Sequence, residues 1–462
     1  MQMKLSAVLI VCLMLLSISV ATQLGGGDTD DENPWPYVGG NLQNTGQSKF
    51  DTSHVDGEIV WNRTIYEGLV PSDTSPVIDY EGNLYLSAGN IIISLDSSGE
   101  KRWDYFSEEG ELTAPGLGAD GTIYTGARED NKLLALDRDD GSVLWSFDTV
   151  GGVTTAPVVD SQNNIYFASY LEEDSARVYS VGTDGNLRWV FDMPVVDNST
   201  KINARVTIGP NGWIYFGSFD NDVYALNRHG DLEWRTDPAP AWGSSTQIFS
   251  SPAIQDGVLY VGTVDGIAAL DAYTGMSVWH FPDESHEEFD FGDQVSVWGS
   301  PAVGQNGQIY FGCTYTIPPP QDETFANPVR MGRIYALYSD GDVRWHMETQ
   351  NIIMSATPAV GSDGTVYMGS NDRAVYAFSP GGNLLWNHSV GRVIDSSPAI
   401  GSDGTVYFVT GGPLPNVFAF SGERIPSEDG TYVPHWSVVV GVTAAIIVVL
   451  VGVHLYKNKS EE

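Results

Sequence analysis

The segment Ser397-Pro-Ala-Ile-Gly-Ser-Asp-Gly-Thr-Val-Tyr-Phe408 decides the fold, because close copies of it recur along most of the 462-residue chain. Thr357-Pro-Ala-Val-Gly-Ser-Asp-Gly-Thr-Val-Tyr-Met368 and Ser300-Pro-Ala-Val-Gly-Gln-Asn-Gly-Gln-Ile-Tyr-Phe311 are the clearest of these copies. Eight copies lie between Ser75 and Gly422. A spacing of roughly 40–45 residues is typical of repeated supersecondary units, and it has to be recognised before any other feature.

Each copy contains four short segments that are rich in β-branched and aromatic residues and are separated by Gly turns, as expected for antiparallel strands. The Ser-Pro segment comes first and is followed by an Ile/Val-Tyr-Phe-Gly segment, a Val-Tyr-Ala-Leu segment and a fourth segment that ends in Trp. One copy, which begins at Ala204, lacks the proline. Hardly any stretch has the period of an amphipathic helix. Because four-stranded sheets repeated around an axis form a β-propeller, we predict an all-β, eight-bladed β-propeller of four-stranded antiparallel blades.

The tryptophans predict how the ring closes. There is one for each blade: Trp61, Trp103, Trp145, Trp189, Trp234, Trp279, Trp345 and Trp386. The last copy has no Trp of its own, whereas Trp61 precedes the first copy. We therefore expect residues 58–64 to supply the outermost strand of the eighth blade. Burial of an indole between blades removes about 150–250 Å² of surface, worth a few kcal/mol at about 25 cal/mol per Å², so we interpret these residues as structural blade-docking side chains.

Two segments interrupt the period of the repeat. Residues 282–298 lengthen the step into the sixth blade, and residues 314–332 lengthen a turn within it. Long insertions on a regular scaffold are where function tends to lie; the alternative is that they are tolerated surface loops. The candidate partner-binding residues in them are Asp283, His286, Phe289, Phe291, Trp298, Tyr315 and Phe325. The carboxylates beside His286 are only a weak indication of a metal site, because a single His in an acidic loop is more often solvated.

The two ends of the chain lie outside the propeller, which is predicted to span residues 34–422. Residues 1–21 have the positive start, apolar run and small-residue cleavage site of a signal peptide. An uncleaved anchor is the alternative, but it would need a longer apolar stretch. Residues 22–33 combine glycines with like charges and are expected to form a flexible acidic leader.

A transmembrane helix is predicted at residues 437–456, after a juxtamembrane linker at 423–436. The run Val438–Leu455 holds no charged residue and as a helix would be about 27 Å long, close to the roughly 30 Å of a hydrocarbon core. Lysines in the tail at 457–462 mark this end as cytoplasmic. A buried core helix is the alternative. The predicted location is therefore the cell membrane, with a single crossing and the N-terminal ectodomain outside the cytoplasm.

The net charge of −37, from 59 acidic and 22 basic residues, argues against nucleic acid and anionic lipid surfaces as partners, because both require a basic footprint. We interpret the acidic excess as a solvated surface. Cys12 falls in the signal peptide, so Cys313 has no partner for an intramolecular disulfide. Three ectodomain sequons are present. Asn62 and Asn387 follow a docking Trp, where burial would prevent modification, so Asn198 is the candidate glycosylation site.

Parts of the chain resemble a known family. Ala135–Trp145 and Ala269–Trp279 resemble the tryptophan-docking motif of quinoprotein propellers, and Trp35–Gly46 resembles the usual opening of pyrroloquinoline-quinone (PQQ)-like repeat proteins. The resemblance covers roughly residues 34–422 and implies an eight-bladed ring. It includes two kinds of relative: quinoprotein alcohol dehydrogenases, which hold PQQ and calcium on the propeller axis, and BamB-type assembly lipoproteins, which use a similar ring without a cofactor as a protein-binding scaffold.

The residues favour the second kind of relative. The dehydrogenases stack their quinone on a disulfide between adjacent cysteines, which the lone Cys313 cannot form, and no segment offers the alternating oxygen ligands of a compact calcium loop. We therefore predict no catalytic residues, no PQQ and no metal. The predicted function is a membrane-anchored, non-catalytic scaffold for extracytoplasmic proteins or cell-surface polymers. The alternatives are a PQQ-dependent dehydrogenase-like enzyme, or a surface protein that binds a polysaccharide or small ligand in the central channel.

Overall fold

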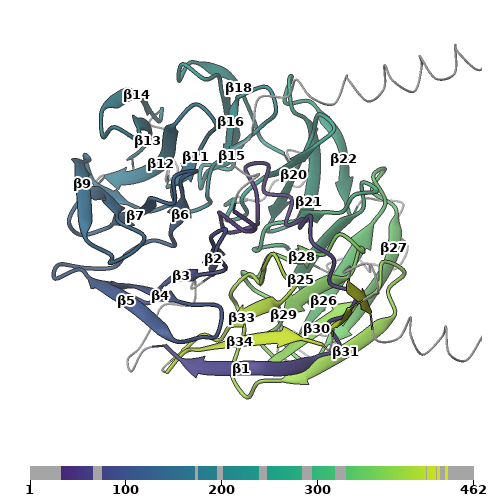
Figure 1. Cartoon of the computed structure of the whole chain (residues 1–462). Coiled ribbons are helices and arrows are strands. Elements are labelled where there is room, and N and C mark those ends of the chain that lie inside the picture. Colours follow the sequence, from purple (N-terminus) through teal and green to yellow (C-terminus); the bar gives the residue numbers. More distant parts are fainter. Residues whose placement is uncertain are drawn as a thin grey trace, which may run out of the picture.

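The computed structural model describes residues 33–65, 75–171, 175–194, 201–238, 247–282, 294–317, 329–412, 414–422, 424–426 and 432–434. These residues form eight antiparallel sheets around a common axis (Figure 1). No helix occurs among the described residues. The structure therefore confirms the predicted all-β propeller of eight four-stranded blades.

The blades follow one another in chain order, and in each the strand nearest the axis comes first. Blade 1 contains β2 (Val77–Ile78), β3 (Leu84–Ser87), β4 (Ile91–Leu95) and β5 (Lys101–Phe106), and blade 2 contains β6 (Gly116–Leu117), β7 (Ile123–Ala127), β8 (Lys132–Leu136) and β9 (Val143–Asp148). Blade 3 contains β11 (Val158–Val159), β12 (Asn164–Leu171), β13 (Ser175–Gly182) and β14 (Leu187–Asp192). Blade 4 contains β15 (Thr207–Ile208), β16 (Ile214–Gly217), β17 (Val223–Leu226) and β18 (Leu232–Thr236). In blade 3, β10 (Gly152–Val153) also pairs with β12.

The second half of the ring repeats this order. Blade 5 contains β19 (Ala253–Gln255), β20 (Val258–Thr263), β21 (Gly266–Asp271) and β22 (Ser277–Phe281), and blade 6 contains β24 (Ala302–Val303), β25 (Ile309–Ile317), β26 (Val329–Leu337) and β27 (Val343–Thr349). Blade 7 contains β28 (Ala359–Val360), β29 (Val366–Gly369), β30 (Ala374–Phe378) and β31 (Leu384–Ser389). Blade 8 contains β32 (Ala399–Ile400), β33 (Val406–Val409), β34 (Asn416–Ser421) and β1 (Glu58–Thr64). In blade 6, β23 (Gln294–Ser296) pairs with β25. A separate hairpin joins β35 (Arg424–Pro426) and β36 (Tyr432–Pro434).

Ring closure occurs in blade 8, where the first strand of the chain is the outermost strand. β1 pairs antiparallel with β34, so that Trp61 lies opposite Ala419 and Asn62 opposite Phe418. Both strands are labelled at the lower edge of the ring in Figure 1, where purple lies beside yellow. An early segment thus completes the final sheet, as the position of Trp61 predicts.

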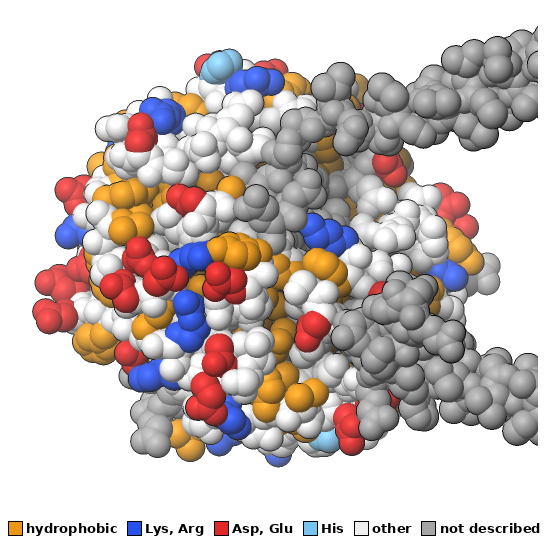
Figure 2. Space-filling view, viewed as in Figure 1, with side chains coloured by type: hydrophobic (Ala, Val, Ile, Leu, Met, Phe, Trp, Pro, Cys, Tyr) orange, Lys and Arg blue, Asp and Glu red, His pale blue; other side chains and the backbone are white. Residues whose placement is uncertain are grey.

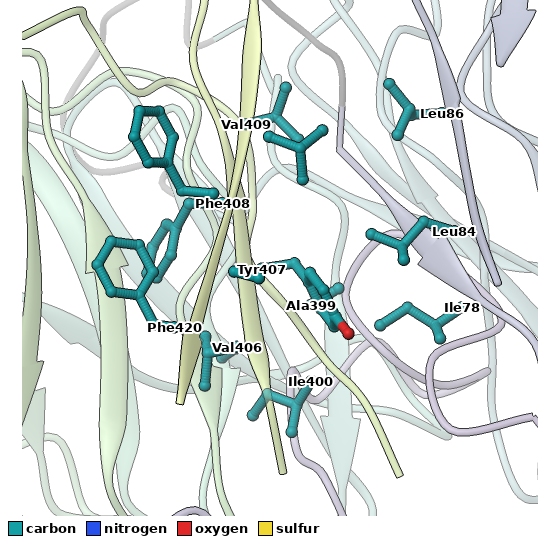
Figure 3. Packing of buried hydrophobic residues seen from close by; sticks show 14 of the residues in the cluster. Ile78, Leu84, Leu86, Ala399, Ile400, Val406, Tyr407, Phe408, Val409 and Phe420 are labelled. Atoms are coloured by element: carbon teal, nitrogen blue, oxygen red, sulfur yellow. The ribbon is translucent and has the colours of Figure 1, made fainter. Parts of the chain in front are cut away.

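The core lies between the blades. The middle strands are buried throughout, as in β7 and β33, because a neighbouring blade covers each face of the sheet. Between blades 1 and 8, Ile78 and Leu84 face Ala399 and Ile400, whereas Phe408 lies on the other side of the blade 8 sheet (Figure 3). A cluster of this kind joins every pair of neighbouring blades within the described residues.

Each of the eight tryptophans links its own blade to the next. Its ring lies 5.8–6.0 Å from the ring of a tyrosine in the same blade, and it covers a glycine with positive φ in the following blade. Seven of the eight indoles donate a hydrogen bond of 2.8–3.1 Å to a carbonyl oxygen of that following blade. At seven of these glycines the indole lies within 2.5–2.9 Å of an added Cβ and occupies the space that a side chain would need, whereas at Gly185 the distance to Trp145 is 3.4 Å.

Residues 34–50, called the strap here, cross one end of the axis and reach seven blades in turn before the chain enters β1. In Figure 1 the strap is the purple segment that winds across the middle of the ring. Its contacts with blades 1 to 7 are Ile78 N–H to Trp35 O (2.8 Å), Leu117 N–H to Pro36 O (3.1 Å), Tyr37 O–H to Val159 O (2.6 Å), Ile208 N–H to Leu42 O (2.9 Å), Ile254 N–H to Gln43 O (2.9 Å), Val303 N–H to Thr45 O (2.7 Å) and Val360 N–H to Gly46 O (2.7 Å).

These contacts fall on the short innermost strands of blades 1 to 7. In these seven blades, a residue of the innermost strand pairs with its own blade and also makes a hydrogen bond to the strap, which satisfies one of its backbone groups. The strap therefore closes the axis at this end.

Acidic side chains are spread over the surface shown in Figure 2, with basic side chains among them. The predicted signal peptide at 1–21, the leader to residue 32 and the predicted transmembrane helix at 437–456 lie outside the described residues. Within the described part of the chain, no helix is long and apolar enough to cross a membrane.

Candidate functional site

The two ends of the propeller differ. Neighbouring strands are antiparallel, so the connections between blades and the turn between the second and third strands of each blade all lie at the end away from the strap. We call this end the open face and the other the strap face. The segment between β22 and β24 and the turn between β25 and β26 both belong to the open face. The described ends of both insertions that were predicted to be functional therefore lie there.

A cavity of about 430 Å³ lies on the axis at the open face. Residues of all eight blades line this cavity, called the funnel here, and Val38 of the strap also contributes to its wall. Because the strap closes the other end of the axis, the funnel is a blind pocket.

A series of four interblade hydrogen bonds runs along the wall of the funnel from blade 5 to blade 1. Ser251 N–H donates to Ser300 Oγ (2.9 Å), Ser300 N–H to Thr357 Oγ1 (3.3 Å), Thr357 N–H to Ser397 Oγ (3.1 Å) and Ser397 N–H to Ser75 Oγ (2.9 Å). These residues precede the proline of their repeats. The small polar residue at this position therefore joins each blade from 5 to 8 to its successor.

Arg205 occupies the equivalent position in blade 4, two residues before β15. Its side chain is 5% exposed, and it is the only buried Lys or Arg among the described residues. Its Nη2 donates to Asn44 Oδ1 at 2.6 Å, and its guanidinium lies 5.8 Å from the centre of the Tyr37 ring. The strap thus holds a buried positive charge in the funnel wall.

Two carboxylates also line the funnel. Glu111 of blade 2 forms an ion pair with Arg128 at 2.9 Å. Asp395 belongs to blade 8, which lies on the opposite side of an eight-bladed ring from Arg205 in blade 4. The funnel is therefore polar across its width, with its buried cation on one side and Asp395 on the other.

An apolar wall completes the funnel. The rings of Trp298 and Phe249 lie 4.6 Å apart, and those of Phe249 and Phe219 lie 4.5 Å apart. Met354, which lines the funnel together with Trp298 and Phe249, is 41% exposed. The site therefore combines buried hydrogen-bond donors with an apolar surface.

One carboxyl group at the open face has a strongly shifted pKa. Asp222 lies in the turn between β16 and β17, beside Asp220, which accepts a hydrogen bond from Tyr224 at 2.7 Å. Burial and the neighbouring Asp220 raise the pKa of Asp222 to about 6. The Arg235 guanidinium at 3.7 Å opposes this shift but does not cancel it.

The predicted partner-binding residues lie in different environments in the structure. Trp298 lines the funnel. Tyr315 is a core residue with 4% exposure, covered by the Arg333 guanidinium at 3.9 Å, so its assignment as a surface contact is wrong. Its side chain points inward because strand alternation continues into the lengthened β25. The candidates Asp283, His286, Phe289, Phe291 and Phe325 and the sequon at Asn198 lie outside the described residues.

The structure also corrects the expected burial of two sequons and adds one residue to the site. Asn62 and Asn387 are exposed on outermost strands, so the expected burial beside the docking tryptophans does not occur: in a strand, the residue after an inward-facing Trp faces outward. Arg205 was missed. Its signal was the missing proline of the fourth copy, where an arginine stands at the position that is small in the other copies.

The described funnel does not fit a calcium-bound quinone. Cys313 is fully buried in β25, and burial raises the pKa of its thiol to about 12, so it offers no platform for a planar ring. No group of three His, Cys, Asp or Glu suited to a metal ion occurs in the part of the chain that the structure describes. Glu111, a carboxylate in the lining, is engaged by Arg128.

Comparison with known proteins identifies related sequences. The sequence profile of a family described as outer membrane protein assembly factor BamB matches residues 49–170, 87–195, 174–317 and 330–433. The assembly factor BamB of Shewanella oneidensis is 24% identical over 244 residues, covering 48% of this chain and 60% of that protein. The serine/threonine-protein kinase AfsK of Streptomyces griseus is 30% identical over 149 residues, covering 30% of this chain and 18% of the kinase. Each match thus spans less than two thirds of the relative.

Solved structures share the fold. A europium-containing methanol dehydrogenase superposes with a TM-score of 0.68 at 13% identity, covering 85% of this chain and 99% of that one. The quinohemoprotein alcohol dehydrogenase of Comamonas testosteroni gives 0.66 at 16% identity, covering 86% and 82%. BamB from Moraxella catarrhalis gives 0.55 at 15% identity, covering 79% and 97%. At these identities the similarity shows the propeller alone.

Proposed function

Because the chain belongs to the family described as outer membrane protein assembly factor BamB, we propose that it is a non-catalytic scaffold that binds extracytoplasmic proteins. The protein is anchored by its predicted C-terminal helix and uses the open face of the propeller for binding. The fold by itself does not decide this, because dehydrogenases share it and function depends on the site.

The observation that supports this proposal best is the asymmetry of the two faces. The strap closes one end of the axis, whereas the funnel and the two longest insertions share the other. Loops that emerge from a rigid scaffold on one side suit partner recognition. A closed axis leaves the open face as the binding surface.

The position of the chain ends gives the scaffold an orientation. β34 runs from the open face to the strap face and ends at Ser421, so the chain toward the predicted helix at 437–456 departs from the strap face. In this proposal the strap face is turned toward the membrane and the open face away from it, where partners approach.

The scaffold acts without PQQ or calcium in this proposal. Two described carboxylates of the funnel would have to hold them. Glu111 is paired with Arg128, and Asp395 lies on another blade. The enzyme alternative is tested by incubating the purified ectodomain with PQQ and calcium and measuring dye reduction with alcohols. Turnover above a heat-denatured control would refute the non-catalytic assignment.

Proximity labelling from the ectodomain in living cells tests the binding role. Residues 283–293 and 318–328 are replaced together by short Gly-Ser linkers, and the labelled proteins are compared with those of the unaltered protein. The expected result is loss of specific partners with an unchanged melting temperature. A matched control replaces the strap-face turn at 160–163 and keeps the partners.

The proposal fails if the variant without the insertions labels the same proteins as the unaltered chain. Binding to a glycan array, with no protein partner in the labelling experiment, would instead support the polysaccharide alternative.

A further inference from the structure

We propose that the funnel binds the C-terminal end of a partner protein chain, with the terminal carboxylate held by Arg205 and the backbone carbonyl oxygens of the last residues by the hydroxyls of Ser300, Thr357 and Ser397. This inference rests on the proposed protein-binding function and names the part of the partner that the site recognises. Four features of the funnel support it: its donors, its charge, its blind shape and its apolar wall.

The serine and threonine hydroxyls of blades 6 to 8 supply donors. Ser300, Thr357 and Ser397 each accept a backbone N–H from the preceding blade. A hydroxyl that accepts a hydrogen bond still has its own hydrogen to donate. Within the described residues none of these three hydroxyls donates to another group, and all three line the funnel. They therefore present hydrogens to a ligand that is rich in acceptor oxygens.

Arg205 supplies the charge. The formal charge of the whole chain is −37, yet the one Lys or Arg buried among the described residues lines this cavity. A guanidinium matches a carboxylate in geometry, and the charged hydrogen bonds are stronger than neutral ones. Asn44 and Tyr37 of the strap position the group, so little side-chain entropy is lost when a carboxylate binds.

The carboxylates of the lining are compatible with this ligand. Glu111 is neutralised by Arg128 at 2.9 Å. Asp395 lies across the funnel from Arg205, in blade 8. A peptide end carries its negative charge at the terminus and N–H donors further along the chain. Such a ligand places its carboxylate at Arg205 and an N–H toward Asp395.

The blind shape selects a chain end. The strap closes the axis, so a polymer cannot pass through the ring. The volume of about 430 Å³ lies within the range of about 300–1,000 Å³ that is common for ligand pockets. A chain end therefore suits this pocket better than a polymer that has to pass through it.

The apolar wall favours a peptide over a sugar. Trp298 directs one ring face at Phe249, 4.6 Å away, and that face is not available for stacking on a sugar ring. The Trp298–Phe249 pair and Met354 instead offer an apolar surface. We expect the last side chain of the ligand to be aliphatic or aromatic.

Fluorescence anisotropy tests this inference with labelled hexapeptides Gly-Ser-Gly-Ser-Gly-X, in which X is Phe, Leu or Val. Each peptide is used with a free C-terminal carboxylate and as its C-terminal amide. At least one free acid is expected to bind the purified ectodomain. Its amide is expected to bind at least about tenfold more weakly, because it lacks the charge that Arg205 recognises.

Two variants locate the binding in the funnel. Arg205→Gln removes the charge, and Ala156→Phe fills the funnel from blade 3 while the charge remains. Both are expected to weaken binding of the free acid at least about tenfold. Arg63→Gln is the matched control. Arg63 lies on the outer strand of blade 8 and forms an exposed ion pair with Glu100, so this variant is expected to bind the free acid as the unaltered protein does. Should Arg205→Gln fail to fold, Ala156→Phe decides the question.

The inference is overturned if no free acid binds, if the amides bind equally well, or if the folded Ala156→Phe variant binds like the unaltered protein. Binding of oligogalacturonate but of no peptide would also overturn it and would assign the funnel to an acidic saccharide. If no peptide binds, the scaffold proposal is unaffected, because it is tested separately by proximity labelling of partners and depends on the insertions.

Discussion

The indole nitrogen of Trp386 lies 3.0 Å from the carbonyl oxygen of Val55, although the two residues are 331 positions apart. Blade 7 thereby packs on the turn that leads into β1, and β1 belongs to blade 8. The same indole covers Gly57, whose φ is +89°. A segment near the start of the chain is thus held between the last two blades, and the stability of the ring depends on it.

Gly57→Ala is expected to destabilise the propeller by about 2–4 kcal/mol. A Cβ at this position would lie 2.9 Å from the Trp386 ring, so the indole must move, and a positive φ also disfavours alanine. Urea unfolding followed by tryptophan fluorescence measures the effect.

The matched control for that measurement is Gly212→Ala, at φ +75° with no atom within 4 Å of the added Cβ. This variant has the backbone strain without the clash and is expected to lose only about 1–2 kcal/mol. Equal losses in the two variants would show that the indole contact contributes nothing.

Tyr37→Phe is expected to cost about 1–2 kcal/mol of unfolding free energy. The Tyr37 hydroxyl donates to Val159 O at 2.6 Å from a fully buried position, so its removal leaves a buried carbonyl oxygen without this donor. Thermal unfolding measures the change, with Tyr273→Phe as the control because Tyr273 is 57% exposed. A melting temperature equal to that of the control would contradict the role assigned to the strap.

Asp222→Asn is expected to stabilise the protein at neutral pH. A carboxyl group whose pKa is raised on folding favours the folded state when it is protonated, and this contribution is lost as the pH rises through about 6. The substitution should therefore add about 1–2 kcal/mol at pH 8 and nothing below about pH 4, where both forms are neutral. Unfolding free energies measured across this range test the sign, and a gain that is independent of pH would refute the electrostatic cause.

Cys313 is expected to be unreactive in the folded protein. In a chain that begins after residue 21 it is the only thiol, and burial both raises its pKa to about 12 and shields it from reagents, so little reactive thiolate is present at pH 8. Dithionitrobenzoate should release no colour from the native protein and one equivalent in urea. Rapid labelling without urea would show that blade 6 opens.

Much of the fold could be predicted from the sequence, because a repeat shows the same strand pattern eight times and local errors average out. The position of Trp61 before the first copy was enough to predict the pairing of β1 with β34. The strap could not be predicted in the same way. Its contacts with the blades are mostly backbone hydrogen bonds, and such bonds leave little trace in the choice of side chains.

The candidate site was less predictable than the fold. Tyr315 seemed accessible because it follows the regular repeat, but the extension of β25 to Ile317 continues the inward and outward alternation and buries it. Arg205 stands in the one copy without a proline, and its importance appears only when the eight copies are arranged in a circle. A site assembled from one residue per blade has no linear motif.

The strap also constrains how the protein is made. It emerges from the ribosome before any of the blades it binds, and its last partner strand, β28, follows more than 300 residues later. Contacts between such distant segments form slowly. The end of the strap must therefore stay unpaired until β28 has been synthesised, and the disc can lock only after the last blade is complete.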